Sequence, residues 1–253
     1  MSLLFAAGAL YAGVKVPVVK NVHISSEKLT REYTVVVLSD LHIHRVISPQ
    51  KIERIVSLAN AQNPDVVLLA GDIIDDDVRR VSKITALLKG LKASKGIYFV
   101  TGNHEFYAGY DETVRELANL GFMFLENDGA AVGKDLYLAG VPDTFAGAAY
   151  GKTPDLNRAF AKAGKGAFRL LVSHTPSDFA GRDFDLEVSG HTHGGQIFPF
   201  HIFAKLHNKY LSGLYPMPGG AEIYVSNGAG QWGPQMRFLA PSEITVLKLT
   251  PEK

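Results

Sequence analysis

The chain of 253 residues predicts an α/β fold in which two β-sheets pack as a sandwich with helices on the outside. Several apolar, β-branched runs each end in a small residue followed by a side chain that can bind metal. Continuous runs of this kind are typical of strands that are buried on both faces. The first three runs alternate with helix-like segments, which indicates right-handed βαβ crossovers and a largely parallel sheet.

The first three predicted strands end in polar residues. They are YTVVVLSD, which ends at Asp40, PDVVLLAGD, which ends at Asp72, and GIYFVTGNH, which ends at Asn103 and His104. Helices are expected over residues 48–62, 78–91 and 110–120. In open α/β sheets, ligands bind at the carboxyl ends of the strands, so we expect a site where these polar side chains meet.

The later strands are predicted from runs of the same kind. FRLLVSH ends at His174, and FDLEVSGHTH ends at His191 and His193. Three further runs, LYLAGVPD, AEIYVSNGAG and EITVLKL, are also expected to be strands. No long helix separates the last two runs, so we expect them to be neighbours in a mixed or antiparallel second sheet.

The N-terminal segment is predicted to stand apart from the main domain. Residues 3–14 are apolar, but they are fewer than the roughly 20 residues that span a bilayer. They also lack the basic n-region and cleavage site of a complete signal peptide. Two alternatives stay open: a short amphipathic or core-docking segment, or the end of a truncated membrane anchor. Residues 1–30 are therefore predicted to be a lead-in, and residues 31–253 to form one domain.

The composition excludes several classes of protein. The chain contains no cysteine, which excludes disulfides, thiolate catalysis and cysteine-ligated zinc. A formal net charge of +1, with acids and bases mixed along the chain, lacks the basic footprint typical of a nucleic-acid binder. Any bound metal must be held by imidazole, carboxylate, amide or water ligands.

The stretch VSGHTHGGQ places His191 and His193 one residue apart, so in an extended segment both imidazoles point to the same side. With the polar residues at the other strand ends, they complete an oxygen and nitrogen ligand set large enough for two divalent ions that share one carboxylate. The full set is Asp40, His42, Asp72, Asn103, His174, His191 and His193. Gly71, Gly102 and Gly190 are expected to let the backbone turn sharply at the strand ends. Two ions roughly 3.5–4 Å apart can clamp both oxygens of a displacement at phosphorus and activate water near neutral pH.

The motifs SDLH, GDIID, GNHE, SH and GHTHGGQ, in this order, resemble the calcineurin-like metallophosphoesterase family, and the resemblance covers residues 33–249. The tail, with KYLSGLY, YVSNGAG and EITVLKL, is similar to the bacterial branch of YkuE- and YaeI-type phosphodiesterases. The resemblance implies a four-layer α/β/β/α sandwich in which residues 31–253 are the catalytic domain. In this branch a membrane-anchoring N-terminal segment is common, which implies a bacterial protein at a membrane or in the cytoplasm.

The resemblance also implies how the ligands divide. One metal would be held by Asp40, His42 and His193 and the other by Asn103, His174 and His191, with Asp72 bridging both. The implied cofactors are two divalent ions, and imidazole, carboxylate and amide ligands together suit Mn, Fe or Zn.

Two further residues are implied in catalysis. His104 would lie beside the metals and donate to the phosphoryl oxygens or the leaving group, and Asp75 would orient it. Glu105 is expected to support the loop and not to bind metal. The protein-phosphatase branch continues this motif as D-R-G, whereas Asp75 is followed by Asp76 and Asp77 in this chain. This departure argues against a calcineurin-type protein phosphatase.

The function predicted on this basis is hydrolysis of a phosphodiester or pyrophosphate bond by metal-bound hydroxide. Residues 197–218 are predicted to be a loop rich in aromatics, which would suit a small, nucleoside-containing or lipid-linked phosphoester, or would pack a small core of its own. The alternatives are a nuclease on the same metal chemistry, which the near-neutral charge disfavours, and a non-catalytic scaffold, which the complete ligand set disfavours.

Overall fold

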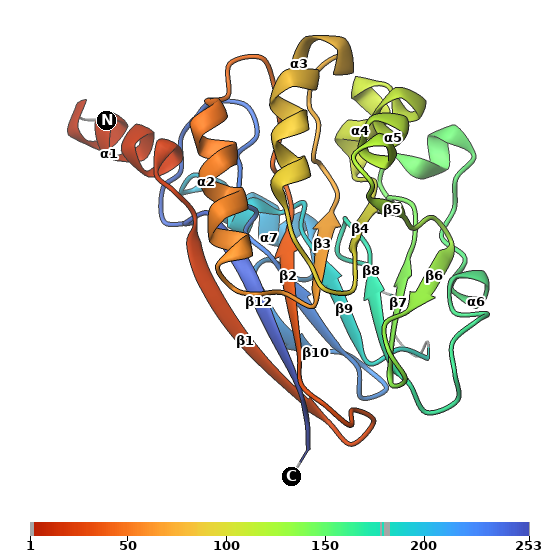
Figure 1. Cartoon of the computed structure of the whole chain (residues 1–253). Helices are drawn as coiled ribbons and strands as arrows, with labels where there is room; N and C mark the ends of the chain where they lie inside the picture. The colour runs from red at the N-terminus through yellow and green to blue at the C-terminus, as the bar shows by residue number, and fades with distance from the viewer. Residues whose placement is uncertain (1–2, 178, 180–182, 253) are drawn as a thin grey trace.

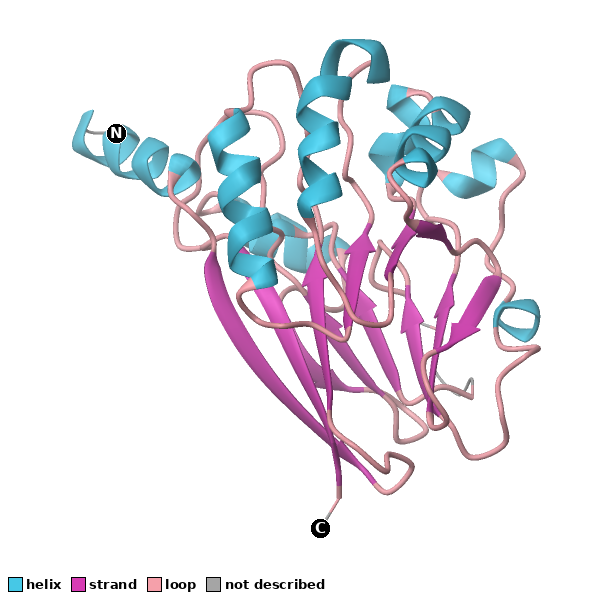
Figure 2. Ribbon diagram, in the orientation of Figure 1, coloured by secondary structure: helices cyan, strands magenta, loops and turns pink. Residues whose placement is uncertain are grey.

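Two six-stranded mixed sheets form the centre of the protein, whose computed structural model describes residues 3–177, 179 and 183–252 (Figures 1 and 2). The first sheet has the order β1 (Val18–Ser26), β12 (Glu243–Pro251), β2 (Tyr33–Leu38), β3 (Val66–Ala70), β4 (Ile97–Val100), β5 (Met123–Phe124). The second has the order β10 (Gly213–Pro216), β11 (Glu222–Val225), β9 (Leu186–Ser189), β8 (Phe168–Val172), β7 (Leu136–Gly140), β6 (Asp128–Ala131).

The helices lie mainly over the first sheet, as Figure 1 shows for α2, α3 and α5. The α-helices are α1 (Leu3–Val14), α2 (Pro49–Asn60), α3 (Val78–Thr85), α4 (Asn103–Ala108), α5 (Tyr110–Asn119), α6 (Leu156–Ala159) and α7 (Phe200–His207). Short 3₁₀ helices are η1 (Ala86–Gly90), η2 (Gly147–Tyr150) and η3 (His193–Gly195). The three helices expected from the sequence are present as α2, α3 with η1, and α5.

Alternating side chains explain why the central strands are apolar throughout. Along β2, Val35 and Val37 point into the core between the two sheets, and Val36 and Leu38 point into the core beneath the helices. Each of these helices closes that second core with one apolar face. In α2 this face consists of Ile52, Ile55, Val56 and Ala59. Because β2, β3, β4 and β5 are parallel, their carboxyl ends meet at one edge.

The predicted two-sheet sandwich with flanking helices is confirmed. The outer face of the second sheet carries its own apolar cluster, which includes Tyr137, Leu171 and Ile223. Side chains from α6 and from the connecting segments, among them Leu156 and Phe179, pack against it. The fourth layer is therefore built of short helices and loops.

One expectation about strand neighbours is wrong. EITVLKL does not lie beside AEIYVSNGAG: β12 belongs to the first sheet, antiparallel to β2 and parallel to β1, whereas β11 pairs with β9 and β10. The physical reason is that β12 is apolar on both faces. Leu247 enters the core between the sheets and Val246 enters the core beneath the helices, so the strand is stable only where both faces are covered.

The N-terminal residues pack against this framework. In α1, Ala9 is fully buried and its carbonyl accepts a hydrogen bond from the backbone N–H of Arg237 at 3.0 Å. Gly13 allows close approach, since a Cβ there would lie 2.3 Å from the carbonyl oxygen of Gln235. β1 pairs with β12 along its whole length, so part of the predicted lead-in contributes to the first sheet. Among the described residues, no helix is long and apolar enough to cross a membrane.

Candidate metal centre

The structure brings all seven candidate ligands to the carboxyl ends of β2, β3, β4, β8 and β9. Asp40, His42 and His193 form one cluster and Asp72, His174 and His191 form another, with ligand atoms within 4.8 Å of one another in each. Asn103 joins the second cluster, because its Oδ1 lies 2.9 Å from Nδ1 of His191.

The side chain of Asp72 lies between the two clusters. Its Oδ2 is 3.2 Å from Nε2 of His174 and 3.7 Å from Nε2 of His42. The carboxylate is almost completely buried, with 2% of its residue surface exposed. Burial opposes its ionisation, but the adjacent histidines outweigh burial and hold the pKa of Asp72 far below its usual range. The position is the one that a shared carboxylate ligand would occupy.

The orientation of His174 fits a metal ligand. Its Nδ1 lies 2.8 Å from the carbonyl oxygen of Ala70. Because a carbonyl oxygen can only accept a hydrogen bond, Nδ1 carries the proton and donates it. This contact leaves Nε2 fully buried and 3.2 Å from Oδ2 of Asp72, in a geometry that forms no hydrogen bond with any described residue. Buried polar atoms in folded proteins are nearly always paired, and metal-bound histidines characteristically donate their other N–H to a carbonyl or carboxylate. A cation at Nε2 satisfies both rules.

The backbone at these ligands is in an uncommon conformation. Five of them are non-glycine residues in the left-handed region, with φ between 46° and 68°. These five are Asp40, His42, Asp72, His191 and His193. Such conformations cost of order 1–3 kcal/mol each and cluster at functional sites. The ligands themselves therefore make the turn that was expected of the neighbouring glycines.

The glycines act differently from the prediction. Of the three predicted glycines, Gly71, Gly102 and Gly190, the first alone has a left-handed φ, of 86°. Gly102 and Gly190 are needed for space: a Cβ would lie 2.2 Å from Oδ1 of Asp72 at the first position and 2.4 Å from Oδ2 of Asp40 at the second. Real Cβ atoms do not approach other atoms so closely, so a larger residue must displace a carboxylate of the cluster.

Gly190→Ala is therefore expected to weaken metal binding with little change in the fold. Displacing a group that supports a ligand typically costs about 10–100-fold in metal affinity. Titration of the metal-free variant with Mn²⁺ or Zn²⁺ measures this loss. Gly164→Ala is the matched control, because a Cβ at Gly164 meets nothing within 4 Å. Equal metal affinities for the two variants would contradict the close-approach argument.

His104 and Asp75 are in direct contact. Nδ1 of His104 hydrogen-bonds to Oδ1 of Asp75, and the backbone N–H of His104 donates to Oδ1 of Asp72 at 2.8 Å. Burial disfavours the imidazolium, but the contact with Asp75 and the charge of Asp72 outweigh burial and raise the pKa of His104. Asp75 also lies 3.4 Å from Nδ1 of His42, so it contacts a candidate ligand as well as His104.

Glu105 has the supporting position expected from the sequence. It is fully buried, and its carboxylate accepts backbone N–H groups from Asp72, Ile73, Ile74 and Gly102. It thereby ties the GDIID loop to the GNHE loop, and it belongs to none of the metal-ligand clusters found among the described residues.

Sequence reasoning missed Arg237. Its side chain is fully buried; Nη2 lies 3.1 Å from Nδ1 of His193, and Nη1 donates to the carbonyl of His193 at 3.3 Å. The guanidinium also binds the carbonyls of Asn227, Gly230 and Ala240, and burial lowers the pKa of Arg237 to about 10. The segment QMRFLA contains no recognisable motif, so the role of Arg237 in holding the loop at His193 is visible only in the folded structure.

A cavity of about 210 Å³ opens over the ligands, and Trp232 forms part of its wall. Other exposed aromatic rings lie beside the histidines of the site. The ring of Tyr107 lies 5.5 Å from that of His104, and the ring of Phe145 lies 5.8 Å from that of His191. The centre is therefore open to a substrate and is bordered by apolar surface.

Comparison with known proteins identifies a family. The calcineurin-like phosphoesterase family matches residues 33–195. A metallophosphoesterase of Helicobacter pylori (strain J99) is 37% identical over 246 residues, which cover 96% of this chain and 66% of the relative. The metallophosphoesterase YkuE of Bacillus subtilis is 31% identical over 233 residues, covering 86% of this chain and 79% of YkuE.

Similarity extends beyond bacteria. A Danio rerio protein named transmembrane protein with metallophosphoesterase domain is 34% identical over 266 residues, covering 98% of this chain and 61% of the relative. The chain thus spans about two thirds of the length of several relatives. Among solved structures, the 5'-nucleotidase precursor of Thermus thermophilus shares the fold, with a TM-score of 0.53, 17% identity and coverage of 87% of this chain and 55% of that one.

The strand-end ligands, the two-sheet sandwich and the family match agree with one another. The names of the family and of these relatives describe phosphoesterases, and the relatives' names add a dependence on metal. The chain belongs to the calcineurin-like phosphoesterase family.

Proposed function

We propose that the protein holds two divalent ions of Mn, Fe or Zn and hydrolyses a phosphodiester or pyrophosphate bond in a small or lipid-linked substrate. One ion is held by Asp40, His42 and His193, and the other by Asn103, His174 and His191. The observation that carries the proposal is the position of the Asp72 carboxylate between the two clusters. When bound, two such ions supply an activated water and neutralise charge on the phosphoryl group.

The protein's own residues complete the reaction. Water loses one proton to solvent; as its oxygen then bonds to phosphorus, the bond from phosphorus to the leaving oxygen breaks, and His104 delivers a proton to that leaving oxygen. Asp75 holds Nδ1 of His104, which leaves Nε2 to face the cavity over the ligands. We therefore assign His104 as the proton donor and Asp75 as the residue that positions it.

Hydrolysis of a phosphodiester analogue that is chiral at phosphorus, a phosphorothioate diester in isotopically labelled water, tests whether water attacks phosphorus directly. The chain has no cysteine, and the site offers activated water as the nucleophile. A single displacement by water is expected to invert the configuration at phosphorus. Retention of configuration, which requires two successive displacements, would show a covalent intermediate and overturn the mechanism.

We further propose that the catalytic domain works beside a membrane. Supporting features are the apolar helix α1, with Leu10 and Tyr11 exposed, and the relative whose name describes a transmembrane protein. The apolar surface at the rim of the metal centre is consistent with such a position.

A further inference from the structure

A second and larger cavity adjoins the metal centre. It has a volume of about 770 Å³ and is lined by apolar side chains that include Ile197, Phe200, Phe203 and Trp232; we call it the α7 cleft. His191 and His193 lie in its wall, and they and Trp232 also line the cavity over the ligands. The two cavities therefore adjoin each other at these three side chains, which places the α7 cleft directly beside the metal centre.

One face of α7 forms a wall of this cleft. Phe200, Phe203, Ala204 and His207 line it, at the spacing of three, four and seven residues that places side chains on one face of a helix. Phe200 and Phe203 remain 61% and 60% exposed, and α7 has no buried residue. This half of the 197–218 segment therefore does not pack a small core of its own.

The rest of the segment behaves differently. Tyr210 and Met217 are buried in the cluster on the outer face of the second sheet, and β10 joins that sheet. The segment therefore has two parts. In residues 198–207 the apolar side chains face cavities or solvent, whereas the part from Tyr210 onward is anchored to the second sheet. Its anchoring fixes the position of α7 beside the metal centre.

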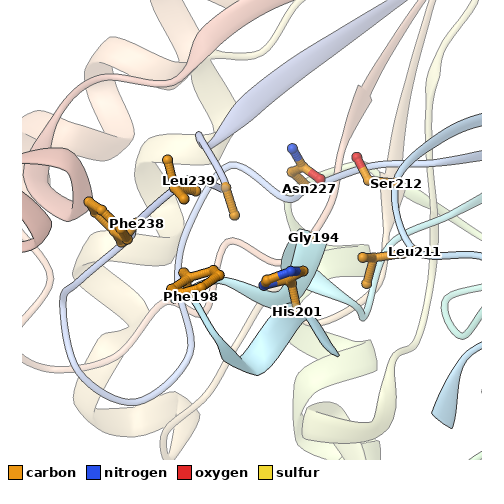
Figure 3. Close-up of a pocket in the computed structure, with 9 residues that line it drawn as sticks. Gly194, Phe198, His201, Leu211, Ser212, Asn227, Phe238 and Leu239 are labelled. Atoms are coloured by element: carbon orange, nitrogen blue, oxygen red, sulfur yellow. The ribbon is translucent and has the colours of Figure 1, made fainter. Parts of the chain in front are cut away.

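The other side of α7 is apolar as well. Ile202 is 50% exposed and Leu206 is 78% exposed. Figure 3 shows Phe198 and His201, at the start of this region, facing a separate pocket of about 370 Å³ opposite Asn227 and Leu211. A short helix with exposed apolar side chains on two of its faces is stabilised when a lipid or another apolar molecule covers them.

The charges of the residues around α7 indicate which kind of apolar molecule covers the helix. Residues 191–221 contain two lysines and four histidines but no aspartate or glutamate. An apolar surface with basic and no acidic side chains matches an anionic lipid, in which acyl chains are joined to a phosphate group. A nucleoside would fill the cleft face of α7 but would leave Ile202 and Leu206 in water.

We propose that the α7 cleft binds the acyl or alkyl chain of a lipid phosphoester while its phosphate lies on the metal centre. This inference rests on the proposed phosphoester hydrolysis and specifies its substrate class. The chain packs against Phe200, Phe203 and Trp232, and the outer face of α7 contacts the lipid surface from which the substrate comes.

Trp232 is the only tryptophan in the chain, so its fluorescence reports on the cleft without requiring turnover. The metal-loaded protein is titrated, below micellar concentrations, with dodecyl phosphate, dodecyl phosphate brominated along its chain, butyl phosphate and adenosine monophosphate. Bromine quenches a nearby indole, so only the brominated dodecyl compound is expected to quench Trp232 strongly. Dodecyl phosphate is expected to bind at least about tenfold more tightly than butyl phosphate, since each methylene moved into an apolar cleft strengthens binding about fourfold.

Two variants of similar kind on opposite faces of α7 make the test specific. Phe203→Ala is expected to reduce the preference for dodecyl over butyl phosphate by about fivefold or more, because it removes apolar area from the cleft wall. Leu206→Ala, on the outer face, is expected to keep bromine quenching of Trp232. Circular dichroism shows whether both variants remain folded, and if Phe203→Ala unfolds, Phe203→Leu replaces it.

Equal affinities for dodecyl and butyl phosphate, or tighter binding of adenosine monophosphate than of dodecyl phosphate, would overturn the proposal. So would a preference for dodecyl over butyl phosphate that Phe203→Ala leaves unchanged. These outcomes differ from failure of the proposed function, which would appear as absence of bound metal and of bis-p-nitrophenyl phosphate hydrolysis in the unmodified protein.

Discussion

Asp72→Ala is expected to remove both metal ions and to lower kcat/KM for bis-p-nitrophenyl phosphate by at least about 10³-fold. The reason is that Oδ2 of Asp72 is within 3.7 Å of a histidine from each cluster, so one substitution takes a ligand from both sites. Metal ions contribute several kcal/mol to such reactions, and each tenfold change in rate corresponds to about 1.4 kcal/mol. Elemental analysis of the purified variant, with steady-state kinetics, measures both effects.

Asp128→Ala is the matched control for this experiment. Asp128 is a carboxylate at the far edge of the second sheet, where it pairs with Lys162 on the surface. An exposed pair of this kind contributes little to stability, so the variant is expected to keep its metals and its activity. Full occupancy of both sites in Asp72→Ala would contradict a shared carboxylate.

His104→Ala is expected to keep both metals and to lose about 10²–10⁴-fold in kcat, or roughly 3–5 kcal/mol of barrier. Loss should be largest for alkyl diesters, whose leaving oxygen needs a proton as the bond breaks. It should shrink for p-nitrophenyl esters, because p-nitrophenolate leaves without one. Loss of a metal would make His104 a ligand, and full activity on an alkyl diester would remove it from the mechanism.

Asp75→Asn separates positioning from simple structural support. The contact with Asp75 raises the pKa of His104, so loss of the carboxylate charge lowers that pKa. A proton donor with a lower pKa loses its proton at lower pH, and the alkaline limb of the kcat profile is expected to move downward in pH. A uniform fall in kcat with an unmoved limb would mean that Asp75 acts only through the fold.

The candidate site could be predicted because each of its residues stands directly after a strand that the sequence itself predicts. Each strand end carries its own polar residue, and parallel strands bring those ends to one edge without any further signal. The same rule applies at β8 and β9, so His174 and His191 arrive beside Asp72 although they lie about a hundred residues away in sequence. The supporting position of Glu105 is predictable as well, since it lies two residues after a candidate ligand.

Other features depend on tertiary contacts that leave no local pattern. The periodicity of β12 shows that both of its faces are apolar, but not which sheet will cover them. Arg237 is an ordinary arginine until folding surrounds it with carbonyl groups and His193. The sequence predicts a loop where α7 forms, because this helix has only eight residues and none of its apolar side chains is buried in the core.

Anomalous diffraction from a crystal of the Mn-loaded or Zn-loaded protein tests the central claim most directly. Two ions that share Asp72 are expected to give two peaks roughly 3.5–4 Å apart. One peak should lie against Asp40, His42 and His193 and the other against Asn103, His174 and His191. A single peak, or peaks that do not contact Asp72, would contradict the account.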